Sequence, residues 1–278
     1  MQAWSDAQRR HGKLIAFVPT MGALHEGHLS LVDRARERGD VVVASIFINP
    51  KQFGPGEDFA KYPRTLEHDC ALLERRGVDV AFTPTVVEVY PPGHATQVSV
   101  LSLTERLEGA TRPTHFAGVT LVVAKLLLAV KPHVAVFGRK DAQQALVVRR
   151  MTEDLRFGIT IDIAPTAREP DGLAMSSRNA YLSPEERRKA VVLSRALRTG
   201  FDLWADGERN AARLVQSMRK VLDDEPDVRL DYLATVNQDT LEPVETVGCG
   251  ALVAGAVHVG RTRLIDNWWV TPDGKGEF

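Results

Sequence analysis

Cysteine is scarce in this sequence, and its charges are nearly balanced. Only two cysteines, Cys70 and Cys249, occur among the 278 residues. This scarcity excludes a disulfide framework as the source of stability, and we expect a protein of the reducing cytoplasm. Lys and Arg number 35 and Asp and Glu number 36, which leaves a net charge of −1. Such a balance gives no general attraction to nucleic acid or to an anionic membrane, and we expect neither as a partner.

Long hydrophobic runs are also missing. The most apolar stretch, residues 119–130, is interrupted by Lys125 and is too short to cross a bilayer. Residues 1–13 are polar and lack the apolar centre of a signal peptide. Apolar residues make up 44% of the chain and charged residues 26%, as in ordinary globular proteins. We therefore expect a protein that folds around a hydrophobic core without disulfides.

Short apolar runs alternate with helical patterns in the first part of the chain. Runs typical of buried strands lie at residues 14–18, 41–48, 78–82, 134–137 and 159–163. Helical periodicity occupies residues 28–37, 65–76, 119–130 and 142–155. This alternation predicts a parallel sheet with helices on both faces, joined by right-handed crossovers. Residues 96–100 predict one additional short strand.

The pattern changes after Pro165. A loop rich in Gly, Ser and Asn covers residues 168–183, and Ser183-Pro184 then predicts the start of a helix. We expect a second helix at residues 210–222 and strands at residues 228–236, 251–259 and 263–270. The sequence therefore predicts two domains. They are a Rossmann-like α/β domain over residues 1–166 and a smaller α+β domain over residues 167–278.

The first candidate motif joins the first strand to the first helix and reads Pro19-Thr-Met-Gly-Ala-Leu-His25-Glu-Gly-His28. In open α/β sheets, ligands bind at the carboxyl ends of strands, and a helix N-terminus there favours phosphate. His25 and His28 are three residues apart, so within one helical turn they share a face. Two imidazoles beside phosphates would donate hydrogen bonds to developing charge. A zinc site is the alternative, although no third ligand is evident.

Three further segments carry polar side chains suited to phosphate or to a small polar substrate. They read Asn49-Pro-Lys-Gln52, Gly138-Arg-Lys140-Asp141-Ala-Gln-Gln144 and Arg168-Glu-Pro-Asp-Gly-Leu-Ala-Met175-Ser-Ser-Arg178-Asn179. Gln52 offers a donor and an acceptor to hydroxyls and a carboxylate, and Gln144 would reach a second substrate. Lys140 is a point cation suited to phosphate, and Asp141 offers oxygen to Mg²⁺. The serines and Arg178 fit phosphate oxygens on a loop with few apolar residues to fix it.

Together these segments resemble one enzyme family. His-x-Gly-His is the signature of the nucleotidylyltransferase superfamily, and the longer string from Phe17 to His28 is similar to pantothenate synthetases in particular. The stretch from Gly138 to Gln144 matches the family pattern Gly-x-Lys-Asp-x-Gln-Gln at every fixed position. The Ser-Ser-Arg string resembles the family's second ATP signature, with Arg178 where tRNA synthetases carry a lysine.

The resemblance implies an AMP-forming ligase of pantothenate biosynthesis, which joins (R)-pantoate to β-alanine through a pantoyl-adenylate, using ATP and Mg²⁺. It implies a homodimer formed through the N-terminal domain, with the C-terminal domain as a lid. By this resemblance the catalytic residues are His25, His28, Lys140, Ser176, Ser177 and Arg178. The implied ATP contacts are Met21, Gly22, Ala23, Leu24, His25, Glu26, Gly27, His28, Gly138, Arg139, Lys140, Asp141, Ala167, Met175, Ser176, Ser177 and Arg178. Gln52 and Gln144 would bind the substrates, and Asp141 would bind Mg²⁺.

Other functions stay open at this point. A true nucleotidylyltransferase would release the nucleotide conjugate and need no amine, and a regulatory module would bind nucleotide without turnover. A tRNA synthetase is disfavoured because no basic anticodon-binding region is visible. Members of the family usually carry a short strand and most of a helix before the segment that begins here at Leu14. We therefore expect that opening strand to be missing and the helix to be shortened.

Overall fold

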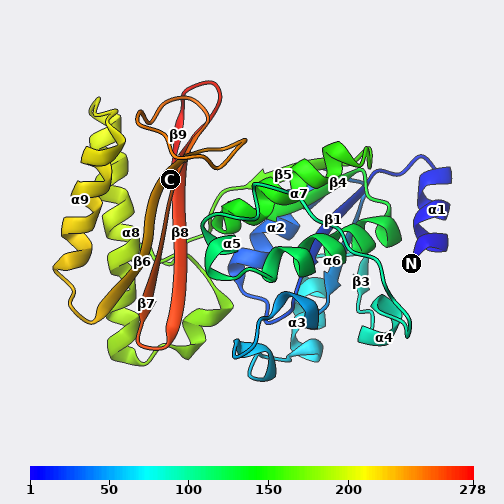
Figure 1. Ribbon diagram of the computed structural model, residues 1–278. Helices are drawn as coiled ribbons and strands as arrows, with labels where there is room; N and C mark the ends of the chain where they lie inside the picture. The colour runs from blue at the N-terminus through cyan, green and yellow to red at the C-terminus, as the bar shows by residue number, and fades with distance from the viewer. The chain divides into compact units, whose positions relative to one another are not determined.

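The structure of this protein, a computed structural model, describes residues 1–278 and forms two compact units (Figure 1). The first unit comprises Met1–Gly138 and Gln143–Ala164, and the second comprises Arg139–Ala142 and Pro165–Phe278. The main division of the chain therefore falls between Ala164 and Pro165, and the short segment Arg139–Ala142 belongs to the second unit.

The sheet of the first unit has five strands in the order β3-β2-β1-β4-β5. They are β1 (Ile15–Thr20), β2 (Val41–Ile46), β3 (Val80–Phe82), β4 (Val134–Gly138) and β5 (Thr160–Ala164). Every neighbouring pair is parallel, which confirms the sheet predicted from the apolar runs. The strand order reverses between β1 and β4. In open α/β sheets this reversal marks the ligand site, at the carboxyl ends of the strands.

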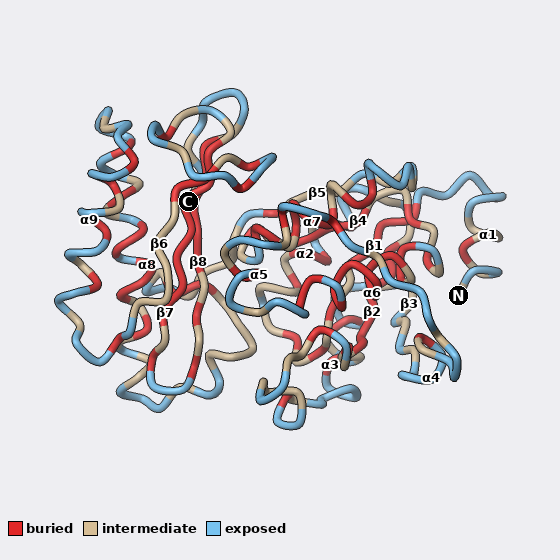
Figure 2. Tube along the Cα trace, viewed as in Figure 1, coloured by how far each residue is buried: buried red, intermediate tan, exposed pale blue.

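Helices lie on both faces of this sheet. The helical elements of residues 1–164 are α1 (Gln2–Arg10), α2 (Glu26–Arg36), α3 (Leu66–Arg75), α4 (Val86–Val89), α5 (Glu108–Thr111), α6 (His115–Val130) and α7 (Ala142–Asp154), with the 3₁₀ turns η1 (Pro50–Gln52), η2 (Asp58–Ala60) and, in the segment of the second unit, η3 (Arg139–Asp141). The connections through α2 and α6 run in opposite directions along the sheet, so right-handed crossovers place these two helices on opposite faces. Helix α6 is buried along most of its length, in keeping with its apolar sequence (Figure 2).

The additional strand predicted at residues 96–100 is wrong, since this segment forms no strand. Its backbone carbonyls bond to side chains instead of to a neighbouring strand. The Val98 carbonyl accepts a hydrogen bond from Thr120 Oγ1 at 2.6 Å, and the Val100 carbonyl accepts one from Thr104 Oγ1 at 2.6 Å. The segment thus lies against α6 as an irregular connection.

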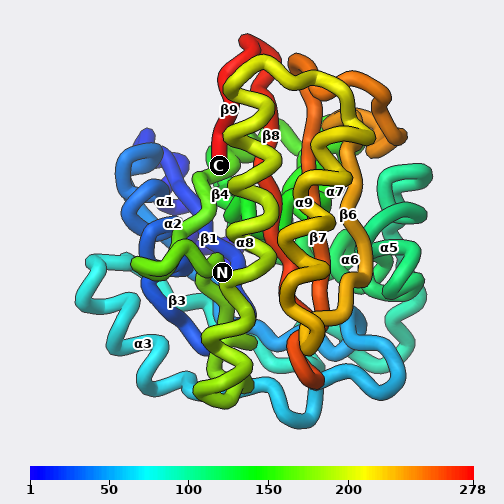
Figure 3. Tube along the Cα trace, turned by 90° about the vertical axis from the view of Figure 1, so that its left-hand side faces the viewer, coloured from blue at the N-terminus to red at the C-terminus, as the bar shows by residue number.

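The second unit has an antiparallel sheet in the order β6-β7-β8-β9, covered on one face by two helices (Figures 1 and 3). Its elements are η4 (Ser177–Tyr181), α8 (Pro184–Ala205), α9 (Ala211–Asp223), β6 (Val228–Asn237), β7 (Ala251–Val259), β8 (Thr262–Val270) and β9 (Gly276–Glu277). Helices α8 and α9 lie side by side, and Leu197, Met218 and Trp268 are fully buried between helices and sheet. This confirms the α+β character predicted for the C-terminal part.

Helix α8 begins where the sequence predicts. Ser183 is its N-cap, and Pro184 occupies the first helical position. The Glu186 N–H donates to Ser183 Oγ at 3.2 Å, and the Ser183 N–H donates to Glu186 Oε2 at 2.8 Å. This reciprocal pair satisfies two N–H groups that the helix itself leaves without partners.

The lid role expected for this unit concerns movement and stays a prediction. None of the helices is long and apolar enough to span a membrane.

Candidate active site

The loop from β1 to α2 is shaped by a buried carboxylate from α3. Asp69 is 1% exposed and accepts hydrogen bonds from the N–H groups of Ala23 and Leu24, both at 2.9 Å. The Thr65 hydroxyl donates to the same carboxylate. Gly22 has a φ of +81°, and a Cβ there would lie 2.9 Å from the carboxylate, so only glycine fits without a shift. Contacts of Ala23 and Leu24 with ATP would therefore use atoms other than these N–H groups.

The two histidines of this loop are held in one tautomer by the backbone. His25 is the N-cap of α2, and its Nδ1 accepts from the Gly27 N–H at 3.1 Å. His28 lies in the first turn, and its Nδ1 faces the His25 N–H at 3.4 Å. Because Nδ1 accepts in both rings, each neutral imidazole carries its hydrogen on Nε2. The ring centroids are 4.1 Å apart. The pair therefore presents two neighbouring N–H donors at a helix N-terminus, where anions bind.

Gln52 ends the turn η1, which follows β2. Asn49, 1% exposed, holds this turn: its Oδ1 accepts from the Lys51 N–H at 3.2 Å, and its Nδ2 donates to Gln52 Oε1 at 3.1 Å. The Tyr90 hydroxyl also donates to Asn49 Oδ1, at 2.8 Å. Burial raises the pKa of Tyr90 to about 12, so this hydroxyl remains a donor at neutral pH. The amide of Gln52 thus lies in a fixed orientation.

The backbone of this turn rests on helix α6. Gly118 of α6 lies so close that a Cβ there would come 2.2 Å from the Lys51 carbonyl oxygen. The Gly118 carbonyl accepts from Asn49 Nδ2 at 3.0 Å. His115, one turn earlier, places Nδ1 2.9 Å from the Gln52 carbonyl oxygen. Since a carbonyl only accepts, this Nδ1 carries the hydrogen and donates it. Helix α6 therefore fixes the position of Gln52 although it carries no motif residue.

An ion pair flanks the same turn. Arg112 donates from Nε and Nη2 to the two carboxylate oxygens of Glu57, each at 2.7 Å. Although burial opposes it, the hydrogen bond and charge of Arg112 hold the pKa of Glu57 below its ordinary value. His115 has its pKa lowered to about 4, first by burial and then by the charge of Arg112. At neutral pH the imidazole beside Gln52 is therefore uncharged.

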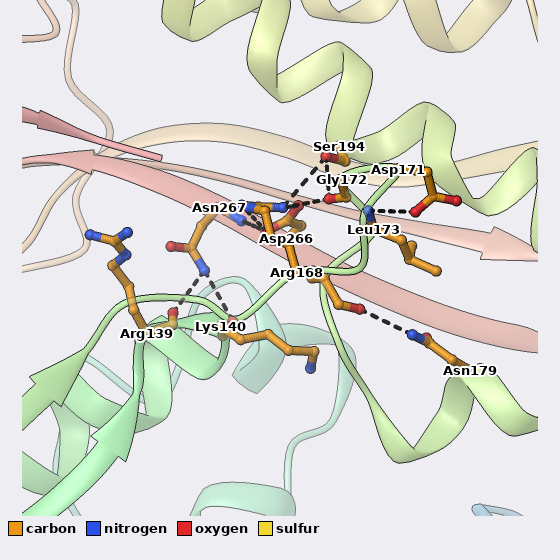
Figure 4. Close-up of polar contacts among 11 residues, drawn as sticks. Arg139, Lys140, Arg168, Asp171, Gly172, Leu173, Asn179, Ser194, Asp266 and Asn267 are labelled. Carbon is orange, nitrogen blue, oxygen red and sulfur yellow. Dashed lines mark hydrogen bonds and ion pairs between the residues drawn. The ribbon is translucent and has the colours of Figure 1, made fainter. Parts of the chain in front are cut away.

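The segment that follows β4 carries Lys140 and lies in the second unit (Figure 4). Asn267 Nδ2 donates to the carbonyls of Arg139 and Lys140, at 2.9 and 3.0 Å. The Arg139 side chain is buried and ion-paired with Glu277. Its Cζ lies over the Trp269 ring, 5.5 Å from the ring centroid. Arg139 therefore fixes the segment. The Lys140 ammonium lies 3.6 Å from the Asp141 carboxylate.

The two neighbouring glutamines after this segment have different environments. Gln143 is buried: its Nε2 donates to the carbonyls of Leu103 and Arg106, and its Oε1 accepts from the Glu108 N–H at 2.9 Å. It holds the irregular loop before α5. Gln144 is only half-buried, at the start of α7. The buried and bonded Gln143 side chain therefore has a structural role. The half-buried Gln144 remains the candidate residue for substrate binding.

The loop with the Ser-Ser-Arg string makes several contacts at its start. The Met175 N–H donates to the Ala167 carbonyl at 3.0 Å, and a bridge joins Arg168 to Ala174. Leu173 and Ala174 are buried, and Leu173 belongs to the core of the second unit. Two apolar residues therefore anchor the start of this loop. The mobility expected of the loop stays a prediction.

The predicted site residues fall into two groups. In the first unit, the loop from Met21 to His28 lies beside Gln52, whose Nε2 is 2.9 Å from Met21 Sδ. In the second unit, Arg139 to Asp141 and the loop through Arg178 are held by one strand, β8. Sequence reasoning gave no positioning role to the residues that hold these groups, namely Asn49, Asp69, Tyr90, Glu57, Arg112, His115, Gly118, Arg168, Asp266 and Asn267.

Comparisons with known proteins show the family of this chain. The family model of pantoate–β-alanine ligase matches residues 1–269. The chain is 56% identical to the pantothenate synthetase of Heliobacterium modesticaldum over 267 residues, covering 96% of this chain and 95% of that protein. The pantothenate synthetase of Acidobacterium capsulatum is 58% identical over 253 residues, or 91% and 85% of the two chains.

Two solved structures are similar as well. The pantothenate synthetase from Thermus thermophilus superposes with a TM-score of 0.90 at 52% identity, over 93% of this chain and 94% of that one. The pantoate–β-alanine ligase from Francisella tularensis, solved in complex with βγ ATP and β-alanine, gives a TM-score of 0.78 at 32% identity. That match covers 96% of this chain and 94% of that one.

The lowered pKa of His115 predicts a loss of stability in mild acid. Its pKa is about 4 in the folded protein and near 6.5 when unfolded, so between these values the unfolded chain binds more protons. The contribution is complete above pH 6.5 and declines as the pH falls towards 4, by at most ~1.4 kcal/mol per pH unit. His115→Gln keeps a donor without titrating, so its unfolding free energy should fall less between pH 6.5 and 4.5.

Urea denaturation at several pH values measures this difference. His68→Gln, at an exposed position of α3, is the control and should follow the unsubstituted protein. Parallel stability curves for the protein and His115→Gln would contradict the assignment.

Proposed function

This chain belongs to the pantoate–β-alanine ligase family, and from that premise we propose that it condenses (R)-pantoate with β-alanine at the expense of ATP. In the first step the pantoate carboxylate attacks the α-phosphorus of ATP and pyrophosphate leaves, which gives pantoyl-adenylate. In the second step the β-alanine amine attacks the acyl carbon and AMP leaves, which gives pantothenate. Adenylation is needed because a carboxylate is a poor acyl donor, whereas AMP is a good leaving group.

The observation that carries this proposal is the family match over residues 1–269, a range that includes all four motifs. Relatives that carry the name pantothenate synthetase align with 96% of the chain. The solved relative from Francisella tularensis was crystallised with βγ ATP and β-alanine, two ligands of the kind that the proposal requires. Fold likeness by itself would not support a substrate, since unrelated functions share Rossmann-like sheets.

The geometry supports specific roles in the adenylation step. His25 and His28 hold their hydrogens on Nε2 and would donate them to phosphate oxygens as charge develops. Lys140, Ser176, Ser177 and Arg178 would neutralise the remaining phosphate charge. The two histidine rings are held by the backbone before substrate arrives, so they need little reorganisation during the reaction.

The remaining polar residues suit the acid and the metal. We assign Gln52 and Gln144 to pantoate, because a side-chain amide pairs with both hydroxyl and carboxylate groups. Asp141 has a half-exposed carboxylate and would be the protein ligand of Mg²⁺. A single carboxylate is sufficient, since Mg²⁺ in such sites is held largely by substrate phosphates and water. When bound, the ion supplies positive charge to the phosphates. A cytoplasmic location and a homodimer formed through the first unit complete the proposal.

The order of the two steps can be tested without β-alanine. Mixed with ATP, Mg²⁺ and pantoate, the protein should release about one pyrophosphate per site and then stop, because the adenylate has no amine to attack it. Added β-alanine should restart the reaction with continuous formation of AMP. Quench-flow assays of pyrophosphate and AMP give both readings.

Two outcomes would contradict the scheme. Absence of pyrophosphate before β-alanine is added would exclude a stepwise reaction. Continuous pyrophosphate release without amine, with a nucleotide conjugate accumulating, would instead identify a nucleotidylyltransferase.

Substitution of His28 should affect the first step selectively. His28→Ala removes one donor to the phosphates and should slow adenylation by about 10²–10³-fold, the usual cost of one transition-state donor. Attack of β-alanine on supplied pantoyl-adenylate should be slowed much less. Single-turnover pyrophosphate release measures the first step, and His68→Ala serves as an exposed control on α3. An equal loss in both steps would place His28 outside this role.

Light scattering tests the homodimer. At micromolar concentration we expect a particle of twice the 30.6 kDa chain mass. A monomer mass would remove the dimer from the proposal while leaving the chemistry intact.

A further inference from the structure

Strand β8 carries two neighbouring buried polar residues, Asp266 and Asn267, which are 3% and 2% exposed. Successive side chains of a strand point to opposite sides. These two therefore reach different segments, and Figure 4 shows both at the centre of one polar network. Burying an Asp or Asn side chain without hydrogen bonds costs folding free energy. The hydrogen-bond partners of these two residues therefore indicate their role.

The partners of Asn267 are two consecutive carbonyls of the Lys140 segment. One amide nitrogen uses both of its hydrogens, at 2.9 Å to Arg139 O and 3.0 Å to Lys140 O (Figure 4). Two carbonyls directed at one point repel each other unless such a donor lies between them. The amide therefore fixes the peptide groups on both sides of the Lys140 Cα, and with them the direction in which this lysine leaves the backbone.

Asp266 holds the Ser-Ser-Arg loop in a comparable way. Its two oxygens accept from Arg168 Nη1 and Nη2 at 2.7 and 3.0 Å, a bidentate ion pair. Arg168 Nη1 also donates to the Gly172 carbonyl at 3.0 Å, which closes the start of the loop.

The end of the loop is tied to the same frame. Ala174, which is bridged to Arg168, accepts through its carbonyl from Asn179 Nδ2 at 3.1 Å. Asn179 follows Ser177 and Arg178 in the short turn η4. A chain of direct contacts therefore leads from Asp266 to the phosphate-binding string.

We propose that Asp266 and Asn267 are positioning residues for adenylation, which hold the Lys140 segment and the Ser-Ser-Arg loop in one frame so that both act on the same polyphosphate. Neither residue touches substrate. Asn267 acts through Lys140, and Asp266 acts through Arg178. This inference rests on the proposed function and assigns it two residues outside the four motifs.

A purely structural role is the alternative, and the chain contains a matched control for it. Gln238 is 7% exposed in the same unit, and its Nε2 likewise donates both hydrogens to two carbonyls, those of Ala251 and Val270, at 3.1 and 3.0 Å. These acceptors lie outside every motif. Removing this amide costs the same kind of buried bonds without touching the Lys140 segment.

The test is a double-mutant cycle on single-turnover pyrophosphate release from ATP and pantoate. Asn267→Ala should slow this release by about 10–10²-fold, the scale expected when a catalytic group is misplaced by about an ångström. In a Lys140→Ala background it should have almost no further effect, because the group through which it acts is gone. Asn267→Ser, which keeps one donor, should fall between, and it replaces Asn267→Ala if that variant does not fold.

The same cycle applies to the other residue. Asp266→Asn should slow adenylation in the unsubstituted protein and add little to Arg178→Ala. Gln238→Ala should lower the melting temperature as the Asn267 variants do, with release within about twofold of the unsubstituted protein. Attack of β-alanine on supplied pantoyl-adenylate should change little in all of them, which a general loss of structure would not allow.

The measured release rates distinguish a positioning role from a purely structural one. If Gln238→Ala slows release as much as Asn267→Ala, or if the effects of Asn267→Ala and Lys140→Ala multiply, the positioning role is wrong although the proposed function stands. If the unsubstituted protein releases no pyrophosphate, the proposed function fails and this inference fails with it.

Discussion

The buried N–H and C=O groups of a motif loop need hydrogen-bond partners where the loop follows its strand. The rest of the candidate site depends on this constraint. At the end of a strand the ladder of hydrogen bonds stops, while the next few peptide groups are still inside the protein. In this molecule a single Asp or Asn side chain supplies hydrogen bonds to these peptide groups after each of three strands. Asp69 accepts from the loop after β1, Asn49 spans the turn after β2, and Asn267 donates to the segment after β4. The backbone that carries the motif side chains is thereby fixed.

The same constraint accounts for the protonation of the histidines. The Nδ1 atom of His25 accepts from the Gly27 N–H and that of His28 from the His25 N–H, at the start of α2, and this pairing places each hydrogen on Nε2. His115 shows the converse, because its Nδ1 faces a carbonyl and so carries the hydrogen itself. Three histidines thus have defined tautomers, set by backbone groups. The contacts that cap the start of α2 thus also place the donor hydrogens of His25 and His28 on Nε2.

The sequence predicts most of the secondary structure and the motif residues, because both depend on local patterns. Apolar runs locate the five parallel strands, and Ser183-Pro184 locates the start of α8. Most of the supporting residues could not be predicted, since they come from distant elements: Asp69 bonds to a residue 45 positions earlier and Asn267 to one 128 positions earlier. The strand predicted at residues 96–100 failed for a related reason, because threonine hydroxyls satisfied its carbonyls.

The placement of Arg139–Ala142 in the second unit has a consequence for biosynthesis of the chain. A ribosome completes the strands of the first sheet before it reaches residue 165, and domains generally begin to fold as they emerge. The carbonyls of Arg139 and Lys140, however, wait for an asparagine made 128 and 127 residues later. The sheet can therefore form early, whereas the Lys140 segment lacks its Asn267 contacts until the whole chain has been made. A prematurely terminated chain would hold the sheet and the histidine pair, but not the amide that fixes the carbonyls of Arg139 and Lys140.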